Sequence, residues 1–472
     1  MKNTLLLLFT FSSFLTFSQL EETTAKVDTA IQEIPDLKEL SLKDAVLGYY
    51  KGLYPSGISE LKMIDGTDDY IYYTKKSYFI KDAATQTEKM KLDVDFFKKD
   101  FPEMKSVPRI LEINNEVMVI NKGDKFIIYN YAGDNKGNKI SIVTPEGSAN
   151  HSFNLKAQAV AYTIDNNLYL ATAKNMQIII FENEDKNIVT GQAIHRYEFG
   201  ISKGIFWSPE GNYVAYYQKD ETDVADYPLL NINVTPGEVN SIKYPMAGQM
   251  SEYGKVGIYN LKKGNKGFLG LVKRKLSLKT GGEKDDHYLT NVTWGPNEDK
   301  FYIAEVNRGQ NHMHFNEYSV KGKNLIRTVF EEKHDKWMEP ENPGFFPTKD
   351  ENTMLWLSEK DGNMNMYKVN MTNGSWTALT NFNFPITSYM GLTIDGTQAF
   401  VQATGTDGRE KHIYKVEIES GKTVQLSTVK GNHSAIFSST GNYIIDTYSN
   451  TETPKVVQVI ETSTIKKSII KT

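Results

Sequence analysis

The sequence predicts an all-β fold: an eight-bladed β-propeller with four-stranded blades and a short N-terminal helical segment. Short aromatic and β-branched runs alternate with turn residues about every ten residues, as in sandwiches, barrels and propellers. A longer motif also recurs, in which an aromatic or apolar pair is followed by a turn, a polar residue or glycine, and a strand. Its later copies lie about 45 to 50 residues apart, which is the length of a four-stranded propeller blade.

The copies of this motif account for the whole predicted propeller. The clear copies are at 206–217, 293–306, 345–358, 392–403 and 436–448, and weaker ones are at 63–74, 110–130 and 162–181. In the copy FWSPEGNYVAYY, a strand through Trp207 turns at 208–211 and returns from Tyr213. Trp207, Trp294 and Trp356 are expected to pack between blades.

Residues 1–18 are predicted to be a signal peptide, because Lys2 precedes an apolar run from Leu5 to Leu15. Gln19 would be the new N-terminus, and an uncleaved membrane anchor is the alternative. Residues 19–40 read as a polar leader, and a short helix is expected after Ser41 as its N-cap. The chain has no cysteine, hence no disulfide or lipoprotein attachment site, and a periplasm or cell surface suits it best.

Beyond that segment, no convincing amphipathic helix is expected. The distance from Trp207 to Trp294 is too long for one blade, which predicts an inserted hairpin near 220–250. Gly-containing turns at 262–264, 372–374 and 419–421 predict further hairpins. The net charge of −4 and the lack of a basic cluster argue against a nucleic-acid partner.

Two motifs that suggest chemistry are given structural interpretations. Gly200–Gly204 matches the G-x-S-x-G nucleophile pattern around Ser202, but a strand and not a helix is expected after it, so no oxyanion site would form. His312 and His314 are a lone i, i+2 pair, without H-E-x-x-H or cysteine partners. No metal, no cofactor and no catalytic residue are therefore expected in this chain.

A series of ordered motifs carries a resemblance to a known family. They are WSP (207–209), GNY (211–213), DETDVADYPLL (220–230), KYPMAG (243–248), GIYNL (257–261), YLTNVTW (288–294), NRGQN (307–311), SEKDG (358–362) and REKHIY (409–414). In this order they resemble the N-terminal propeller of the dipeptidyl peptidase IV family, exported serine peptidases of the prolyl oligopeptidase type, in its bacterial form. The resemblance covers nearly the whole chain after the signal peptide.

The resemblance implies a domain organisation. In this family an eight-bladed propeller precedes an α/β-hydrolase domain that holds the catalytic serine, aspartate and histidine. This chain ends at Thr472, where that domain should begin. The expectation is therefore a signal peptide at 1–18, a leader at 19–40 and a propeller at 41–472 without the hydrolase domain. Whether the protein acts as an enzyme stays open, and this chain alone is expected to be inactive.

The resemblance also points to Glu198 as the main site residue. In the family a glutamate at this place holds the free α-ammonium of the peptide substrate. A carboxylate in a partly desolvated site suits that role, since it accepts charge-assisted hydrogen bonds. The family commonly has two adjacent glutamates, whereas Tyr197 and Phe199 flank a single one here, so dipeptide or tripeptide length is left open.

Arg196 is the second substrate-binding candidate. If the segment were a strand, Arg196 and Glu198 would share one face and His195 would lie on the other. Arg196 could then orient Glu198 or contact a substrate carbonyl. The alternative is that Glu198 is a rim carboxylate neutralised by Arg196 or Lys203.

Three functions remain open from the sequence. The first is the substrate-gating and N-terminus-binding propeller of a dipeptidyl-peptidase-IV-like peptidase. The others are a freestanding peptide-binding propeller without catalysis, and an unrelated propeller scaffold or glycan-active protein. The expected partners are a peptide with a free N-terminus and a separately encoded hydrolase domain. The chain is expected to be a monomer or weak homodimer, because family dimers use the hydrolase domain together with the inserted hairpin.

Overall fold

The computed structural model describes residues 39–55, 57–264 and 287–471, so the predicted signal peptide and nearly all of the leader lie outside the described residues. The chain divides into two units, Met1–Tyr54 and Pro55–Thr472. In the first unit a helix, α1 (Leu42–Leu47), is followed by the 3-10 turn η1 (Tyr49–Lys51). The Ser41 hydroxyl accepts from the Asp44 N–H at 3.1 Å, which confirms the predicted N-cap.

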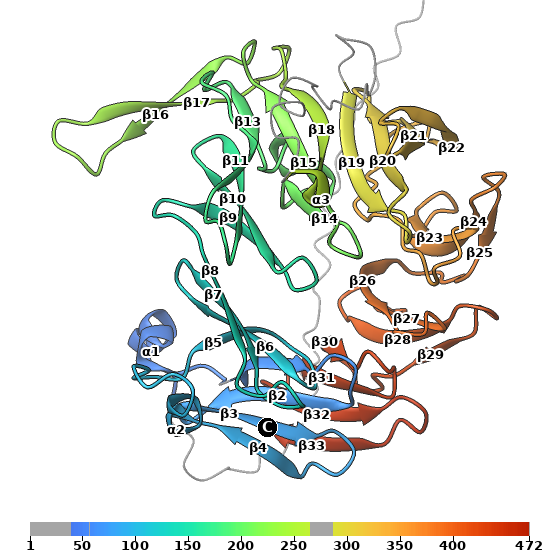
Figure 1. The fold of residues 1–472 in the computed structure, drawn as a ribbon. Coiled ribbons are helices and arrows are strands. Elements are labelled where there is room, and N and C mark those ends of the chain that lie inside the picture. Colours follow the sequence, from blue (N-terminus) through green and yellow to red (C-terminus); the bar gives the residue numbers. More distant parts are fainter. Residues whose placement is uncertain (1–38, 56, 265–286, 472) are drawn as a thin grey trace, which may run out of the picture. The chain divides into compact units, whose positions relative to one another are not determined.

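The second unit is an eight-bladed β-propeller, as predicted, with very few helices (Figure 1). The blades follow one another along the chain, and all strand pairings within them are antiparallel. Their strands are β1 to β4 (Ser59–Met63, Asp69–Thr74, Ser77–Asp82, Glu88–Leu92), β5 to β8 (Arg109–Ile113, Val117–Lys122, Lys125–Asn130, Lys139–Val143), β9 to β12 (Ala149–Asn154, Ala159–Ile164, Asn167–Thr172, Ile178–Phe181), β13, β14, β15 and β18 (Ile188–Thr190, Ile205–Trp207, Tyr213–Asp220, Tyr253–Asn260), β19 to β22 (His287–Trp294, Lys300–Asn307, His312–Ser319, Leu325–Lys333), β23 to β25 (Thr353–Ser358, Asn365–Asn370, Trp376–Ala378), β26 to β29 (Ile386–Leu392, Gln398–Ala403, His412–Glu417, Thr423–Gln425) and β30 to β33 (Asn432–Phe437, Tyr443–Ser449, Val456–Glu461, Lys467–Lys471).

The recurring turn has the same hydrogen bonds in different blades. In the fourth blade the Ser208 hydroxyl accepts from the Tyr213 N–H at 2.9 Å, and the Ser208 carbonyl accepts from Gly211. In the eighth blade Ser438 makes the same two contacts, with Tyr443 and a glycine at 441. Both glycines have positive φ, 70° and 81°, which a side chain would disfavour. The repeat in the sequence is therefore a repeat of one turn geometry.

Tryptophans connect successive blades. The Trp207 indole N–H donates to the Ser152 carbonyl of the third blade at 3.1 Å, and Trp294 donates to the Phe206 carbonyl of the fourth at 3.2 Å. Trp356 is fully buried in a cluster formed with side chains of the fifth blade. The prediction that these rings pack between blades is confirmed.

The first and last blades each take all four strands from one end of the chain, so no shared strand connects them. Side-chain contacts join these two blades instead. The Asp68 carboxylate accepts from the Asn442 amide at 2.9 Å and from the Thr440 hydroxyl. Tyr70 of β2 packs in one apolar cluster with Val457 of β32. The blue and red sheets therefore lie side by side in Figure 1.

The fourth blade has an interrupted strand. β13 pairs with the end of β15, at Gln218, Lys219 and Asp220, while β14 pairs with Val214, Ala215 and Tyr216 of the same strand. β18 pairs along the other edge of β15. β13 and β14 thus lie end to end along the same edge of β15 and together take the place of one strand. The residues between them, 191–204, lie outside the sheet. The predicted hairpin of β14 and β15 is confirmed.

The insertion predicted near 220–250 is a two-stranded hairpin that extends from the fourth blade (Figure 1). Its strands are β16 (Asp226–Asn231) and β17 (Glu238–Lys243). Leu230, Ile232 and Val239 on this hairpin are 66%, 79% and 64% exposed. Apolar exposure of this extent on one element is typical of an interaction surface.

Two local predictions were wrong. A short helix, α2 (Val94–Lys98), forms after the first blade because the Asp93 carboxylate caps it, accepting from the Phe96 N–H at 2.9 Å. The expected turn at 262–264 is instead part of a one-turn helix, α3 (Leu261–Gly264). The turns at 372–374 and 419–421 do connect strands, namely β24 to β25 and β28 to β29. Among the described residues, no helix has the length and apolarity needed to cross a membrane.

Candidate functional site

The segment that contains Glu198 is a distorted 3-10 turn, η2 (His195–Gly200), in the break between β13 and β14. The expected strand alternation is therefore wrong here. His195, Arg196, Tyr197 and Phe199 all have positive φ, between 54° and 68°, whereas Glu198 has φ −57°. Each such residue costs on the order of 1–3 kcal/mol and persists only where the surroundings fix it, a feature that clusters at functional sites.

His195 fixes the start of η2. It is 3% exposed, and its Nε2 accepts from the Leu289 N–H of β19 at 3.0 Å. Its own backbone N–H donates to the Glu252 carboxylate. Burial, assisted by the neighbouring His287, Lys219 and Arg308, lowers the pKa of His195 to about 3. The imidazole is therefore neutral and acts as the hydrogen-bond acceptor that Leu289 requires.

A buried charge cluster supports His195. The Lys219 ammonium lies 2.7 Å from the Glu221 carboxylate and 3.5 Å from that of Glu252. Gly254 leaves room for the imidazole, since a Cβ at this position would lie 3.0 Å from two of the ring atoms. These residues are structural supports of η2, because they reach it through His195.

Phe199 fixes the other end of η2. Its side chain is 5% exposed and packs edge-to-face on Tyr288, with ring centroids 5.1 Å apart. The Thr290 hydroxyl donates to the Phe199 carbonyl at 3.4 Å. Because His195 and Phe199 are both anchored inward, Arg196, Tyr197 and Glu198 between them are exposed.

The carboxylate of Glu198 forms no hydrogen bond or ion pair with any residue that the structure describes. The two cations proposed to neutralise it make other contacts. Arg196 lies over the Tyr244 ring, 4.5 Å from its centroid, and donates to the Lys243 carbonyl at 3.3 Å. The Lys203 ammonium lies 5.3 Å from the centroid of the Phe206 ring. The structure thus brings Arg196 and Glu198 onto one turn but does not pair them.

Two cavities adjoin η2. The larger, of about 350 Å³, is lined by residues on both sides of the break between β13 and β14, among them Gln192, Arg196, Tyr197, Lys203 and Lys219. Among the described residues, its lining includes no carboxylate and three cationic side chains, of which Lys219 is already paired with Glu221 and Glu252. The positive charges of Arg196 and Lys203 suit carbonyl or carboxylate oxygens of a ligand. The smaller, of about 190 Å³, begins at Phe199 and Gly200. Glu198 lines neither cavity. It lies in the sequence between Tyr197, which lines the larger cavity, and Phe199, which lines the smaller one.

Ser202 is not part of a nucleophile elbow. The chain continues from Gly204 into the strand β14, so no helix follows the serine. The predicted strand after Ser202 is confirmed. Ser202 instead contributes to the lining of both cavities.

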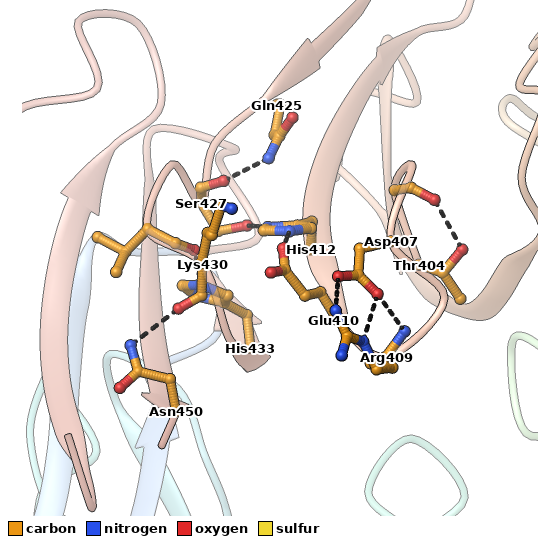
Figure 2. A network of polar contacts seen from close by, with 12 residues as sticks. Thr404, Asp407, Arg409, Glu410, His412, Gln425, Ser427, Lys430, His433 and Asn450 are labelled. Carbon is orange, nitrogen blue, oxygen red and sulfur yellow. Dashed lines mark hydrogen bonds and ion pairs between the residues drawn. The ribbon is translucent and has the colours of Figure 1, made fainter. Parts of the chain in front are cut away.

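A second polar cluster has the composition of a catalytic triad but not its accessibility (Figure 2). The His412 imidazole lies between Ser427, whose Oγ is 3.2 Å from Nδ1, and Glu410, whose Oε2 is 2.9 Å from Nε2. Ser427 is 0% exposed, and its Oγ also accepts from the Ile413 N–H at 2.9 Å. A substrate could not reach this hydroxyl, so the cluster is structural.

A comparison with protein families identifies the chain. Residues 123–455 match the model of the dipeptidyl peptidase IV (DPP IV) N-terminal region. The chain therefore belongs to this family, and the resemblance seen in its motifs is confirmed.

Individual relatives agree with that assignment. A protein of Chaetomium globosum described as a probable dipeptidyl-aminopeptidase B is 25% identical to this chain over 332 residues, which cover 64% of this chain and 35% of the relative. Dipeptidyl aminopeptidase B of Saccharomyces cerevisiae is 23% identical over 329 residues, covering 62% and 38%. The chain thus spans little more than a third of the length of these relatives.

Solved structures show the same fold. A Bacteroides ovatus protein assigned as a dipeptidyl aminopeptidase IV superposes with a TM-score of 0.78 and 29% identity, covering 88% of this chain and 60% of that one. Dipeptidyl peptidase 4 of Porphyromonas gingivalis gives a TM-score of 0.71 at 18% identity, with coverage of 92% and 62%. The second likeness concerns the fold alone.

Sequence reasoning missed the residues that support η2. Glu252, Lys219 and Gly254 lie on strands or loops that pairing along β15 brings behind His195. Their sequence positions, 20 to 60 residues after the turn, gave no sign of this proximity. The only signal in the sequence was that His195, the residue they support, lies next to Arg196.

Proposed function

We propose that this propeller is the substrate-gating and N-terminus-binding part of an exported, dipeptidyl-peptidase-IV-like serine peptidase. In this proposal the propeller captures the free amine of a peptide, and a hydrolase domain performs the cleavage. That domain would be contributed by the same polypeptide or by a separate one. Membership in the DPP IV N-terminal family supports the proposal.

The observation that carries it is the state of Glu198. Its carboxylate is exposed, has no partner among the described residues, and sits on a turn whose strained backbone is fixed from both ends. An acceptor prepared in this way favours binding, because the protein does not need to reorganise when a ligand arrives. The structural alternative, a carboxylate neutralised by its neighbours, finds no support in the contacts of Arg196 and Lys203.

The chemistry of recognition follows from the two signs of charge at η2. A peptide ammonium would pair with Glu198 by charge-assisted hydrogen bonds. The carbonyl oxygens that follow in the peptide would face Arg196 and the cationic lining of the larger cavity. Such a pairing measures the substrate from its N-terminus, which is what an aminopeptidase requires. The single glutamate leaves the length of the released fragment as a further question.

The β16–β17 hairpin supports a proposal about assembly. Its exposed leucine, isoleucine and valine side chains offer an apolar surface on a narrow element. Dimers in the family use this hairpin together with the hydrolase domain, so the hairpin alone would supply only part of the ~1,200–2,000 Å² that stable interfaces bury. We therefore expect a monomer in equilibrium with a weak homodimer.

Binding of N-terminally modified peptides tests the proposal. The probe is a short peptide with proline in second position and a fluorophore at its C-terminus. Acetylation of its amine should weaken binding roughly 10- to 100-fold, since the bound peptide would cover Glu198 and a hydrogen bond to a charged group shielded from water contributes about 1.5–3 kcal/mol. Dimethylation, which adds similar bulk but keeps the positive charge, is the matched control and should be tolerated far better. Equal binding of the free and acetylated peptides would contradict the proposal.

A further inference from the structure

A second group of ligating side chains lies on the outer strands of the fifth blade. His312 and His314 project from the same face of β21, and the strand register places His314 directly opposite Glu331 of β22. The Nε2 atom of His312 lies 2.9 Å from Oε2 of Glu331, and that of His314 lies 3.7 Å from Oε1. One ligand atom from each residue can be chosen so that all three lie within 4.8 Å of one another.

From this arrangement we infer that His312, His314 and Glu331 form a binding site for Zn²⁺ or a similar divalent transition-metal ion. Two imidazoles and one carboxylate are ligands that zinc prefers. Bond lengths of about 2.0–2.1 Å in a tetrahedron separate ligand atoms by roughly 3.3–3.4 Å. The two histidine–glutamate separations, 2.9 Å to Oε2 and 3.7 Å to Oε1, lie on either side of that value, and all three ligand atoms lie within 4.8 Å of one another, so rotation of the side chains would have to bring them to tetrahedral spacing.

The site is open to solvent. The side chains of His312, His314 and Glu331 are 28%, 39% and 46% exposed, so an ion can enter and a water molecule can complete the tetrahedron. The Lys333 ammonium lies 3.3 Å from Glu331 and competes for its carboxylate. That side chain is 66% exposed, so it can turn into water when a metal ion arrives.

The backbone beneath the site is well fixed. The side-chain oxygen Oδ1 of Asn307 accepts from the backbone N–H groups of Asn311 and His312 at 3.0 and 3.1 Å. The side-chain Nδ2 of Asn307 donates to Oδ1 of Asn311 at 2.9 Å. His314 lies in the ladder between Glu305 and Glu331. Metal sites depend on such supporting hydrogen bonds to hold their ligands in place.

The same turn lies close to the support of η2. Arg308, one residue after Asn307, contacts the Tyr288 ring, which packs on His195 and Phe199. The inferred site nevertheless does not depend on peptide recognition by Glu198, since it uses other residues. The sequence led us to expect no metal because the histidine pair had no third ligand nearby. The pairing of β21 with β22 supplies it.

Titration of the metal-free full chain with Zn²⁺ alone, followed by calorimetry or by competition with a chromophoric chelator, tests this inference. The expected result is one equivalent bound at this site. His312→Ala, His314→Ala and Glu331→Gln should each weaken binding at least tenfold. Lys333→Gln should strengthen it, and Asp335→Asn, which changes an exposed carboxylate in the loop after β22, should leave it unchanged. Absence of binding, or equal binding by the three ligand variants, would overturn the inference.

A second readout uses the unaltered chain and so does not depend on the folding of variants. Diethyl pyrocarbonate modifies accessible imidazoles, and Zn²⁺ should protect His312 and His314 in peptide mass spectra. His334, an exposed histidine outside the cluster, should be modified with and without the ion. Modification of His312 and His314 that is unaffected by Zn²⁺ would also overturn the inference.

Discussion

The backbone N–H of Leu289 donates to Nε2 of His195 at 3.0 Å, so the fifth blade holds a buried histidine of the fourth blade in its neutral form. This contact fixes the start of η2, and the Phe199 ring fixes its end. The exposed residues between them owe their position to both blades. Recognition at Glu198 would therefore depend on residues that no peptide touches.

Gly254→Ala should displace the His195 ring, and with it the turn η2. The new methyl group would lie 3.0 Å from the His195 ring, and overpacking of this kind costs about 1–3 kcal/mol. Peptide affinity should fall together with the melting temperature, although residue 254 contacts no part of the proposed peptide site. Gly408→Ala is the matched control, because a Cβ there meets nothing within 4 Å. Equal behaviour of the two variants in thermal melts and peptide titrations would contradict this view of η2.

The buried His195 should make stability depend on pH. Its pKa in the folded chain, about 3, is below the value of about 6.5 expected when unfolded, so between these values only the unfolded chain takes up the proton. Stability from this group is complete above pH 6.5 and falls by about 1.4 kcal/mol for each pH unit below it.

His195→Gln removes this titration while keeping an acceptor for Leu289. The difference in unfolding free energy between the original chain and the variant should therefore shrink from pH 7.5 to pH 5.5. Denaturant titrations at the two pH values measure it, and other titrating groups cancel in the difference. A constant difference would show that the histidine is not buried in neutral form.

The His433–Asp446 pair should be a main contributor to the stability of the eighth blade. His433 Nδ1 lies 2.9 Å from the Asp446 carboxylate, both side chains are fully buried, and Gln458 donates to the same carboxylate. His433 also donates from Nε2 to the Val429 carbonyl at 2.7 Å. Asp446→Asn should destabilise the protein by about 3–5 kcal/mol, since it leaves one partner of a buried pair uncompensated.

Asp407→Asn serves as the comparison for that variant. Asp407 pairs with Arg409 on the surface, as Figure 2 shows near His412, and exposed pairs contribute little to stability. Thermal melts should separate the two variants clearly. A melting temperature unchanged by Asp446→Asn would contradict the assigned role of the buried pair.

The β16–β17 hairpin should mediate any self-association. Leu230→Ser combined with Val239→Ser removes two exposed apolar side chains that lie opposite each other in the hairpin register. Sedimentation velocity should show concentration-dependent association of the original chain and a monomer for the variant, with equal melting temperatures. A tight dimer that survives the double substitution would show that the interface lies elsewhere.

The fold could be predicted from the sequence because a propeller repeats local signals. The turn that Ser208 and Ser438 form is set by neighbouring residues, so the motif that contains it is visible in the sequence as a regular spacing. The conformation of η2 was not predictable in the same way. Its positive φ values are imposed by His195 and Phe199, whose partners Leu289 and Tyr288 lie about ninety residues further along the chain.

The candidate site was only partly predictable for the same reason. The family resemblance pointed to Glu198 and strand alternation to Arg196, and the structure exposes both on one turn. The prediction that both side chains lie on one face of a strand was wrong, because this segment is the turn η2 and strand alternation does not hold there. The third donor of the inferred metal site, Glu331, became apparent only from the register between β21 and β22.

The most direct test combines Glu198→Gln with N-terminal acetylation of the peptide, measured as four dissociation constants. We expect the original chain to prefer the free amine at least tenfold and the variant to show no preference. The two melting temperatures should be equal, because Glu198 has no partner among the described residues. Glu341→Gln, which changes an exposed carboxylate next to Gly200, should retain the preference. An undiminished preference in Glu198→Gln would contradict recognition of the peptide ammonium by this carboxylate.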